Sequence, residues 1–434
     1  MFLPIHQGIL VSLKKNIDAI RSFVEKLPVL FEKASSSSNC LGSALKIVHE
    51  LIAEIGGRIT VFQATLPNIG PGCLKPREDP NQRAGNDVQN LVPATDFYKT
   101  LALECTGHQV ALDLFLLNTQ YADLATLSEI AKFSTGCVYH FPNYHCLNDV
   151  VQVKRFEKIF ARYLTRKIGF EAVLRIRCSR GLSLSTFYGN FFVRSTDLLA
   201  LANVNPDSAI AVQVALEEKL STSVCFQAAL LYTSSKGDRR IRVHTMCLPT
   251  TADLAQVYNN FDLKATVSLI AKIGEWLHLA ITYLLLECFC IEGVDRSLTG
   301  SPLSDSREAI VNAVVDSLGA YQKTMRQGRA GGLLAPRQGH LRLFPLYALA
   351  MLKHTSFCAG RSIKLDDRVA AMLMLRFCPL EQILSEFYPQ MYRINEILQH
   401  SFRCYDNPFS EKVHAFVRHV TALKFYVGPV IIVK

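Results

Sequence analysis

Arginines spaced two residues apart are the residues of this sequence best suited to binding chemistry. Arg240 and Arg242 alternate with apolar residues, and Arg175 and Arg177 repeat the spacing upstream. Neighbouring side chains of a β-strand point to opposite faces, so each pair lies on one face of its strand. A guanidinium group binds carboxylate and phosphate through paired hydrogen bonds. If the two strands lie in one sheet, the four arginines form a basic face for acidic peptide tails or lipid headgroups.

A solvated outer sheet face explains the same pattern without any ligand. The arginines would then pair with acidic neighbours such as Glu217 or Glu218. The residues leave these two interpretations open. Nucleic acid is a weaker third candidate, because the basic strands lack the interleaved aromatic residues on which single-stranded bases stack.

Cys137, His140, His145 and Cys146 form the best candidate metal site, and zinc accepts all four as ligands. However, Cys137 and His140 are three positions apart in an expected strand and so face opposite sides. His145 and Cys146 are adjacent beyond a proline and would not converge. We therefore favour a buried thiol and loop histidines over zinc, and expect neither a metal nor another cofactor.

Signatures of common enzyme classes are absent from the sequence. It contains no GxxxxGK[ST], no GxGxxG after a strand, no GxSxG and no HExxH. The glycine-rich stretch 70–76 contains Pro71, which removes an amide that a phosphate cradle needs. No spacing places a nucleophile beside a base. These absences predict a binding protein and not an enzyme.

The elements that position these residues begin with alternating strands and helices, which are typical of an α/β domain with a mainly parallel sheet. The segment 109–117 is apolar on both parities except for Asp113, as expected for a strand covered by helices on both faces. We expect strands over 8–13, 57–66, 109–117 and 136–141, and helices over 15–33, 41–54, 95–105 and 122–134.

A period of two replaces this pattern from about residue 165 and predicts an antiparallel β-sandwich. Its strands are expected over 170–178, 182–188, 208–217, 224–233 and 239–248. Helical periodicity follows Thr250, over 306–322, 343–353 and 366–378. The predicted domains are the C-terminal part of an α/β trunk (1–145), a β-sandwich (146–250), a helical domain (251–397) and an atypical tail (398–434).

Composition agrees with a multidomain globular protein. The chain has 434 residues, and its 47 Lys and Arg exceed its 37 Asp and Glu to give +10, which favours an anionic partner. Thirteen cysteines without a CxxC pair indicate reduced, buried thiols of a cytosolic protein. The apolar segment 276–290 is shorter than the ~20 residues that span a bilayer. It contains Glu287, so a buried helix or sequence foreign to the fold is favoured.

Several segments resemble the cargo-adaptor subunit of the inner COPII coat, in the form of two metazoan paralogues that share an LKPRE-PNQR stretch. The segments are 56–83, 165–199, 231–245, 305–322 and 341–353. The GTPase-activating sister subunit shares YTSSKG-RRIRV but neither LKPRE nor TDFYKTLALEC. The resemblance implies a von Willebrand A-like trunk, a β-sandwich and a helical domain with an insertion at 274–293. It also implies a fragment without the family's zinc finger, first part of the trunk and gelsolin-like domain.

The same resemblance implies a non-enzymatic adaptor that binds export signals in cytosolic tails of membrane cargo during endoplasmic reticulum to Golgi transport. Implied partners are the GTPase-activating inner-coat subunit, an acidic membrane surface and, through the coat complex, a small GTPase, but no nucleic acid. The implied location is cytoplasmic, on COPII-coated vesicles and the cytosolic face of the endoplasmic reticulum. The alternatives are the sister subunit itself, which would act through an inserted arginine, and a basic nucleic-acid-binding protein.

Overall fold

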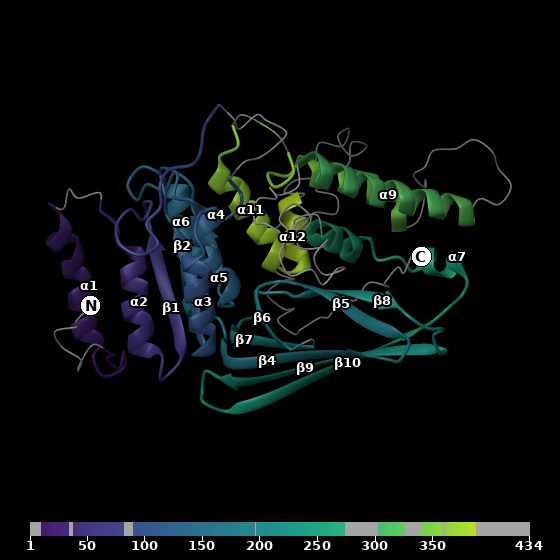
Figure 1. The fold of residues 1–434 in the computed structure, drawn as a ribbon, viewed down its shortest axis with the longest axis horizontal. Coiled ribbons are helices and arrows are strands. Elements are labelled where there is room, and N and C mark those ends of the chain that lie inside the picture. The colour runs from purple at the N-terminus through teal and green to yellow at the C-terminus, as the bar shows by residue number, and fades with distance from the viewer. Residues whose placement is uncertain are drawn as a thin grey trace, which may run out of the picture.

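The computed structural model describes residues 10–33, 38–81, 90–195, 197–273, 303–325, 340–358, 360 and 362–387. An α/β part, a β-sandwich and a helical part follow one another along the chain and pack together (Figure 1). The segments 274–293 and 398–434, including the apolar stretch 276–290, lie outside the described residues. Within the described ranges, no helix is both long and apolar enough to cross a membrane.

The trunk is built on a parallel sheet of three described strands in the order β1-β2-β3. The strands are β1 (Gly57–Gln63), β2 (Val110–Leu116) and β3 (Val138–His140). Every residue of β2 is buried, as its two-sided apolar pattern predicted. One face of β2 packs with the helices that precede and follow it, and the other carries Phe115 against an aromatic cluster. The expected parallel sheet is therefore confirmed.

Helices flank this sheet on both sides. Those that bury residues are α2 (Leu41–Ile52), α3 (Phe97–Gly107), α4 (Leu124–Leu127), α5 (Glu129–Phe133) and α6 (Val150–Thr165), whereas α1 (Ile17–Phe31) buries none. The single helix expected over 122–134 is thus two short helices. The strand expected over 8–13 is wrong for its described part, since residues 10–13 form no strand. Leu10, Val11 and Leu13 are mostly exposed there, and none of the described strands pairs with this segment.

Helix α6 was not expected, and it lies in the range 146–250 that we assigned to the β-sandwich. Asp149 caps its first turn by accepting a hydrogen bond from the Gln152 backbone NH. Its aromatic residues Phe156, Phe160 and Tyr163 recur at helical spacing and pack on Phe115 of β2. This helix therefore completes the layer on the second face of the trunk sheet.

Two antiparallel sheets form the β-sandwich, one of five strands in the order β10-β9-β4-β7-β6 and one of two strands, β5-β8. The bounds are β4 (Gly169–Cys178), β5 (Leu182–Tyr188), β6 (Phe192–Ser195), β7 (Leu198–Val204), β8 (Ala211–Leu216), β9 (Ser223–Ser234) and β10 (Arg239–Pro249). The predicted sandwich is confirmed, but β6 and β7 were not expected. Strand β7 is buried over five successive residues, so the alternating pattern used to find strands does not apply to it.

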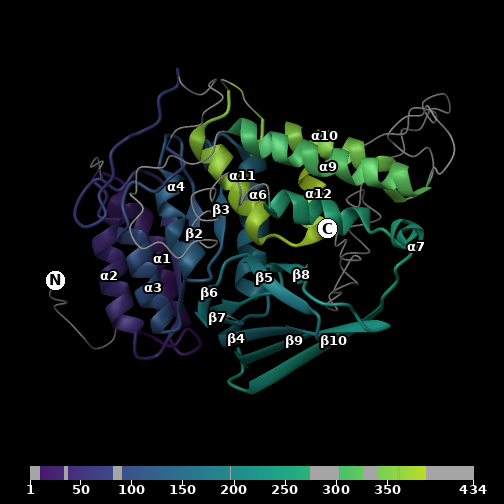
Figure 2. The ribbon, with the colours of Figure 1, turned by 45° about the vertical axis from the view of Figure 1, so that its right-hand side comes forward.

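The described helical part comprises α7 (Leu254–Asn259), a helix over 263–273, α9 (Leu303–Met325), η2 (His340–Leu343), α10 (Phe344–Lys353), α11 (Leu365–Phe377) and α12 (Leu380–Phe387). Figure 2 shows α9, α11 and α12 above the sandwich, with α11 toward the trunk. The apolar residues of the helical part continue the hydrophobic core of the trunk. The helices expected over 306–322, 343–353 and 366–378 are confirmed, and α12 was not expected.

Candidate functional site

The register of the five-stranded sheet places Arg175 and Arg177 on its outer face. Arg175 is opposite Ala229 of β9, which is opposite Val243 of β10, and Arg177 is opposite Gln227 in the next row. The outer face is solvent-exposed along β10, where Ile241 and Val243 are 69% and 53% exposed. The two β4 arginines thus lie side by side beside an exposed row of small, polar and aliphatic side chains.

Arg240 and Arg242 lie on the other, inner face of the same sheet. Their partners on β9 are Tyr232 and Leu230, which belong to the core cluster of the sandwich. The expectation that all four arginines share one side therefore does not hold. Parity within each strand was right, but a shift of one residue in the pairing between strands reverses the face, and the sequence does not specify that shift.

The electrostatic surroundings of the two pairs also differ. Arg175 contacts Asp197 at 2.6 Å, and Arg177 has no acidic partner among the residues that the structure describes. Arg240 is paired with Asp238 at 2.7 Å, a hydrogen bond that raises the pKa of the guanidinium. Arg242 donates from Nε to the Tyr232 hydroxyl at 2.9 Å. Both β10 arginines therefore contact groups of the β9–β10 hairpin, whereas in the β4 pair Arg175 is ion-paired and Arg177 has no acidic partner within the described ranges.

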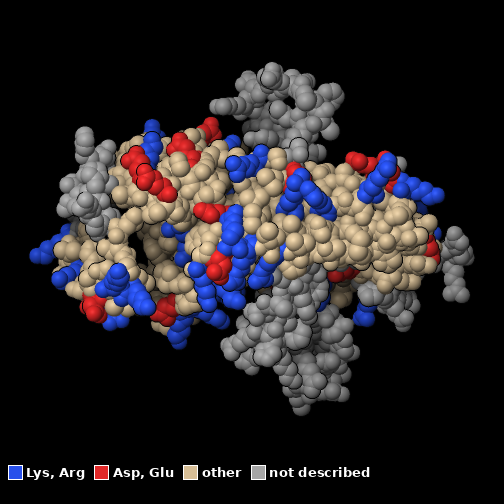
Figure 3. Space-filling view, turned by 90° about the horizontal axis from the view of Figure 1, so that it is seen from below, with Lys and Arg blue, Asp and Glu red and all other residues tan. Residues whose placement is uncertain are grey.

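Figure 3 shows the face that carries the underside of the sandwich and trunk. Lys and Arg side chains gather near its middle, with fewer Asp and Glu side chains among them. Glu217 and Glu218, the acidic partners considered from the sequence, do not pair with the β4 arginines. Instead Glu218 lies 3.4 Å from Arg180. Arg175 and Arg180 are thus ion-paired, and Arg177 between them has no acidic partner among the described residues.

The four residues weighed as zinc ligands do not come together. Cys137 is buried, and its sulfur lies 3.7 Å from the Asn205 side-chain nitrogen. His140 hydrogen-bonds through Nε2 with Asn118 at 3.0 Å, and burial lowers its pKa to about 4. His145 accepts backbone hydrogen bonds in an exposed loop. Among the described residues, no group of three His, Cys, Asp or Glu side chains could hold a metal ion.

Two cysteines contradict the expectation that the thiols are reduced. Cys225 of β9 and Cys247 of β10 are joined in a disulfide. They are directly opposite each other in the hairpin register. The sequence contains a signal for this pairing. Thr233 and Arg239 are opposite each other on the two sides of the SSKGD turn, and the register continues without a shift outward to Cys225 and Cys247. The signal in the sequence is the equal distance of the two cysteines from the turn, which a count of cysteines does not reveal.

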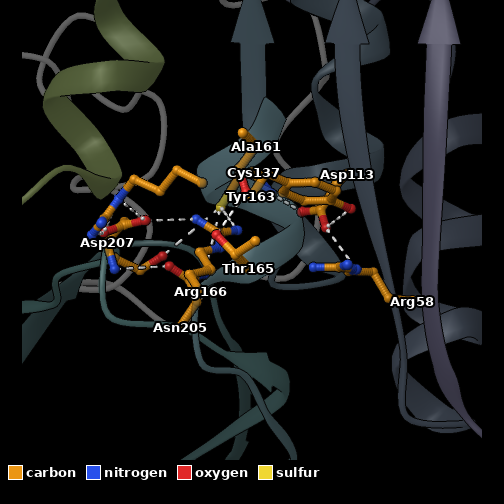
Figure 4. Close-up of polar contacts among 11 residues, drawn as sticks. Arg58, Asp113, Cys137, Ala161, Tyr163, Thr165, Arg166, Asn205 and Asp207 are labelled. Carbon is orange, nitrogen blue, oxygen red and sulfur yellow. Dashed lines mark hydrogen bonds and ion pairs between the residues drawn. The ribbon is translucent and has the colours of Figure 1, made fainter. Parts of the chain in front are cut away.

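A buried polar network fixes the sandwich against the trunk, and Figure 4 shows its members. Asp113, the one polar residue expected in strand β2, accepts hydrogen bonds from the Tyr163 hydroxyl at 2.9 Å and from the Cys137 backbone NH at 2.7 Å. Arg58 lies 3.9 Å from the same carboxylate. Burial nevertheless raises the pKa of the Asp113 carboxyl.

The sandwich side of this network is an acidic residue, Asp207. Its carboxylate binds Arg166, the residue directly after helix α6, at 3.1 Å (Figure 4). It also pairs with Arg162 in the last turn of that helix. The Arg166 side chain is only 3% exposed. Because helix α6 leads directly into β4, this junction sets the position of Arg175 and Arg177 relative to the trunk.

The family models that match the chain follow the same three-part order. The Sec23/Sec24 trunk domain matches residues 1–164, the Sec23/Sec24 beta-sandwich domain matches 169–251 and the Sec23/Sec24 helical domain matches 284–385. All of helix α6 except its last residue falls within the first of these ranges. The matches therefore cover each of the three described parts.

Curated relatives carry Sec24 names. Human protein transport protein Sec24B is 49% identical over 92% of this chain, and mouse Sec24A is 48% identical over 92%. A Sec24 of Aspergillus terreus is 38% identical over 91%. The chain spans about a third of the first two, 30% and 35%.

A solved structure agrees with these matches. The human COPII-coat protein Sec24c superposes with a TM-score of 0.77 at 27% identity, over 89% of this chain and 49% of that one. Sequence and fold thus point the same way, and the chain belongs to the Sec23/Sec24 family as a partial Sec24-like protein.

Proposed function

We propose that this chain is a non-enzymatic cargo-adaptor component of the COPII coat, which binds acidic export signals in cytosolic tails of membrane proteins. The observation that carries the proposal is the match to three consecutive Sec23/Sec24 domains together with 49% identity to human Sec24B. The matching relatives are Sec24 proteins, so the alternatives of a GTPase-activating sister subunit and of a nucleic-acid-binding protein receive no support from them.

Arg175 and Arg177 are the groups that we assign to the acidic signal. They project from one exposed face of β4, about 7 Å apart along the strand, which matches two carboxylates of an extended peptide. Their neighbours in the β9 rows are the short Ala229 and the neutral Gln227, so no large side chain of β9 blocks the guanidinium groups. An incoming carboxylate competes with Asp197 for Arg175 and meets no such rival at Arg177.

Arg240 and Arg242 receive a different role in this proposal. Their side chains contact Asp238 and Tyr232 within the hairpin, so their charge supports the hairpin and adds to the general attraction for an acidic membrane surface. Their position on the opposite face makes them a matched control, because removing them changes the net charge by the same amount.

The test is fluorescence anisotropy of a labelled peptide with two glutamates, titrated with the full chain. R175A/R177A should weaken binding at least tenfold, since each hydrogen bond to a charged group contributes about 1.5–3 kcal/mol. R240A/R242A should change the dissociation constant by less than about twofold. Equal weakening by both double variants would reduce the effect to net charge, and unchanged binding by R175A/R177A would overturn the assignment.

Family membership also supports a proposal about partners. We propose that the chain pairs with the GTPase-activating inner-coat subunit and, through that coat, with its small GTPase, on the cytosolic face of the endoplasmic reticulum. Co-flotation with liposomes containing acidic lipid, with and without that subunit, tests the assembly. The chain alone should not stimulate GTP hydrolysis by the coat GTPase, and stimulation would favour the sister-subunit alternative.

A further inference from the structure

The Cys225–Cys247 pair lies where small solutes can reach it. Both residues belong to the outer face of the five-stranded sheet, and their Cα atoms are 4.2 Å apart. Cys247 is exposed and Cys225 is half-buried. Strand β10 is the edge of the sheet, with β9 as its one neighbour in the strand order. No other layer of the described structure covers this side of β10, since alternate residues from Ile241 to Pro249 are exposed.

The pair closes the hairpin at the end opposite to its turn. The turn is formed around Gly237, whose positive φ of 89° suits a residue without a side chain. At the other end, the Thr250 backbone NH donates to the Thr222 carbonyl, three residues beyond the cysteines on each strand. Between these ends the edge strand depends on backbone pairing with β9. A covalent bond at Cys225–Cys247 therefore fixes the half of β10 that the turn does not hold.

The neighbouring row of side chains contains Arg177. Gln227, opposite Arg177, donates from its side-chain nitrogen to the Thr245 hydroxyl at 3.2 Å. Ser179, two residues beyond Arg177, accepts a hydrogen bond from the Cys225 backbone NH at 2.7 Å. The pair is thus built into the outer face at the C-terminal end of β4, where Cys225 is hydrogen-bonded to Ser179.

We propose that Cys225 and Cys247 form a reversible thiol–disulfide modification site for low-molecular-weight thiols of the glutathione class, and that its oxidised form clamps the edge strand β10. In reduction, a thiolate attacks one sulfur, the S–S bond breaks, and the second cysteine leaves as thiolate and takes up a proton. A second thiol resolves the mixed disulfide. Overall, the protein disulfide and two thiols give the protein dithiol and one small-molecule disulfide, and oxidation runs the same steps backwards.

The effect of the disulfide on hairpin opening follows from the length of the loop that it closes, and the two cysteines have a sequence separation of 22. A cross-link of that length restricts the opened hairpin enough to shift its opening equilibrium on the order of a hundredfold. The amide hydrogens of the far half of β10 should exchange more slowly by a similar factor in the oxidised chain. This expectation concerns the hairpin alone and does not depend on what the arginines bind.

The test equilibrates the full chain in buffers of varied reduced and oxidised glutathione, traps free thiols with N-ethylmaleimide and maps linked peptides by mass spectrometry. A peptide joining Cys225 and Cys247 should appear reversibly as the oxidised fraction rises. Cys40, Cys73 and Cys146 are exposed and unpaired, so they serve as internal controls and should form only mixed disulfides. In C225S the remaining Cys247 should carry one glutathione, which confirms access.

Amide hydrogen exchange then shows whether the disulfide stabilises strand β10 or has no effect on it. Oxidised and reduced wild type should differ over residues 243–249, and the C225S/C247S chain should match the reduced form in both buffers. C146S is the matched control and should behave as wild type. A linked peptide that never exceeds the random pairs formed with Cys146, or equal exchange in both redox states, would overturn the proposal.

Discussion

Asp366 at the start of helix α11 offers a sharp test of how the helical part is attached to the trunk. Its buried carboxylate accepts hydrogen bonds from the backbone NH groups of Ala122 and Leu124, both at 2.8 Å, and from the Asn118 side chain at 3.2 Å. Burial is the main cause that raises the pKa of this carboxyl, to about 6, against the lowering effect of the two backbone donors.

Replacing Asp366 with alanine leaves two backbone donors without an acceptor. Each buried unsatisfied donor costs about 1–3 kcal/mol, so D366A should lower the free energy of unfolding by roughly 2–6 kcal/mol at pH 4, where the wild-type carboxyl is protonated. At neutral pH D366A also removes the buried charge, which offsets about 3 kcal/mol of this loss. D366N keeps the size and one acceptor oxygen and loses one of these bonds. It also removes a buried charge, and a pKa raised from about 4 to about 6 corresponds to about 3 kcal/mol at neutral pH. D366N should therefore be close to neutral.

The contribution of Asp366 to stability changes with pH in a definite direction. The folded carboxyl binds its proton more tightly than the unfolded one, so its contribution to stability is greatest below pH 4 and is lost as the pH rises to about 6. Urea unfolding followed by far-UV circular dichroism at pH 4 to 7 measures this for wild type, D366A and D366N. The exposed Asp316 provides the control, and D316A should change the free energy by less than about 0.5 kcal/mol. The reasoning fails if D366N is as damaging as D366A at pH 7.

Two further predictions concern stability. Burial lowers the pKa of His354 to about 4, so its contribution is complete above about pH 6.5 and is lost as the pH falls toward 4. Between pH 6.5 and pH 4, the free energy of unfolding of H354Q should therefore fall by about 3 kcal/mol less than that of wild type. An unchanged pH profile in urea titrations would contradict the assignment of this loss to His354. At Gly136 an added Cβ would overlap the Leu112 carbonyl, whereas Gly107 has nothing within 4 Å. G136A should lower the melting temperature clearly, while G107A should leave it within about 2 °C, and equal effects in scanning calorimetry would contradict the packing.

Much of the architecture could be predicted because it depends on local patterns. The two-sided apolar pattern of β2 and the period of two in β4 and in the second half of β10 follow directly from what each strand buries. Strand β7 escaped prediction because a strand buried on both faces shows no alternation. Helix α6 was missed although Phe156, Phe160 and Tyr163 already marked one face of a helix.

The candidate site was predicted less well than the fold. Arg175 and Arg177 were correctly placed on one face of a strand, as were Arg240 and Arg242. Whether the two arginine pairs share a face depends on the registers of β4 and β10 with β9, which lies between them in the sheet. The register of β4 with β9 joins strands that are far apart in the chain. That register is decided by which rows of side chains fill the sandwich core, here Tyr232 and Leu230, and not by the strands separately.

By itself, the sequence determined the order of domains, the family resemblance and the alternation of basic and apolar side chains, because these depend on residues close together in the chain. Only the tertiary structure decided which face each arginine occupies, that Cys225 meets Cys247, and that Asp207 and Asp366 hold the domains together. These features arise from contacts between distant segments, whose geometry is fixed only when the hydrophobic rows of the sheets and helices pack against one another.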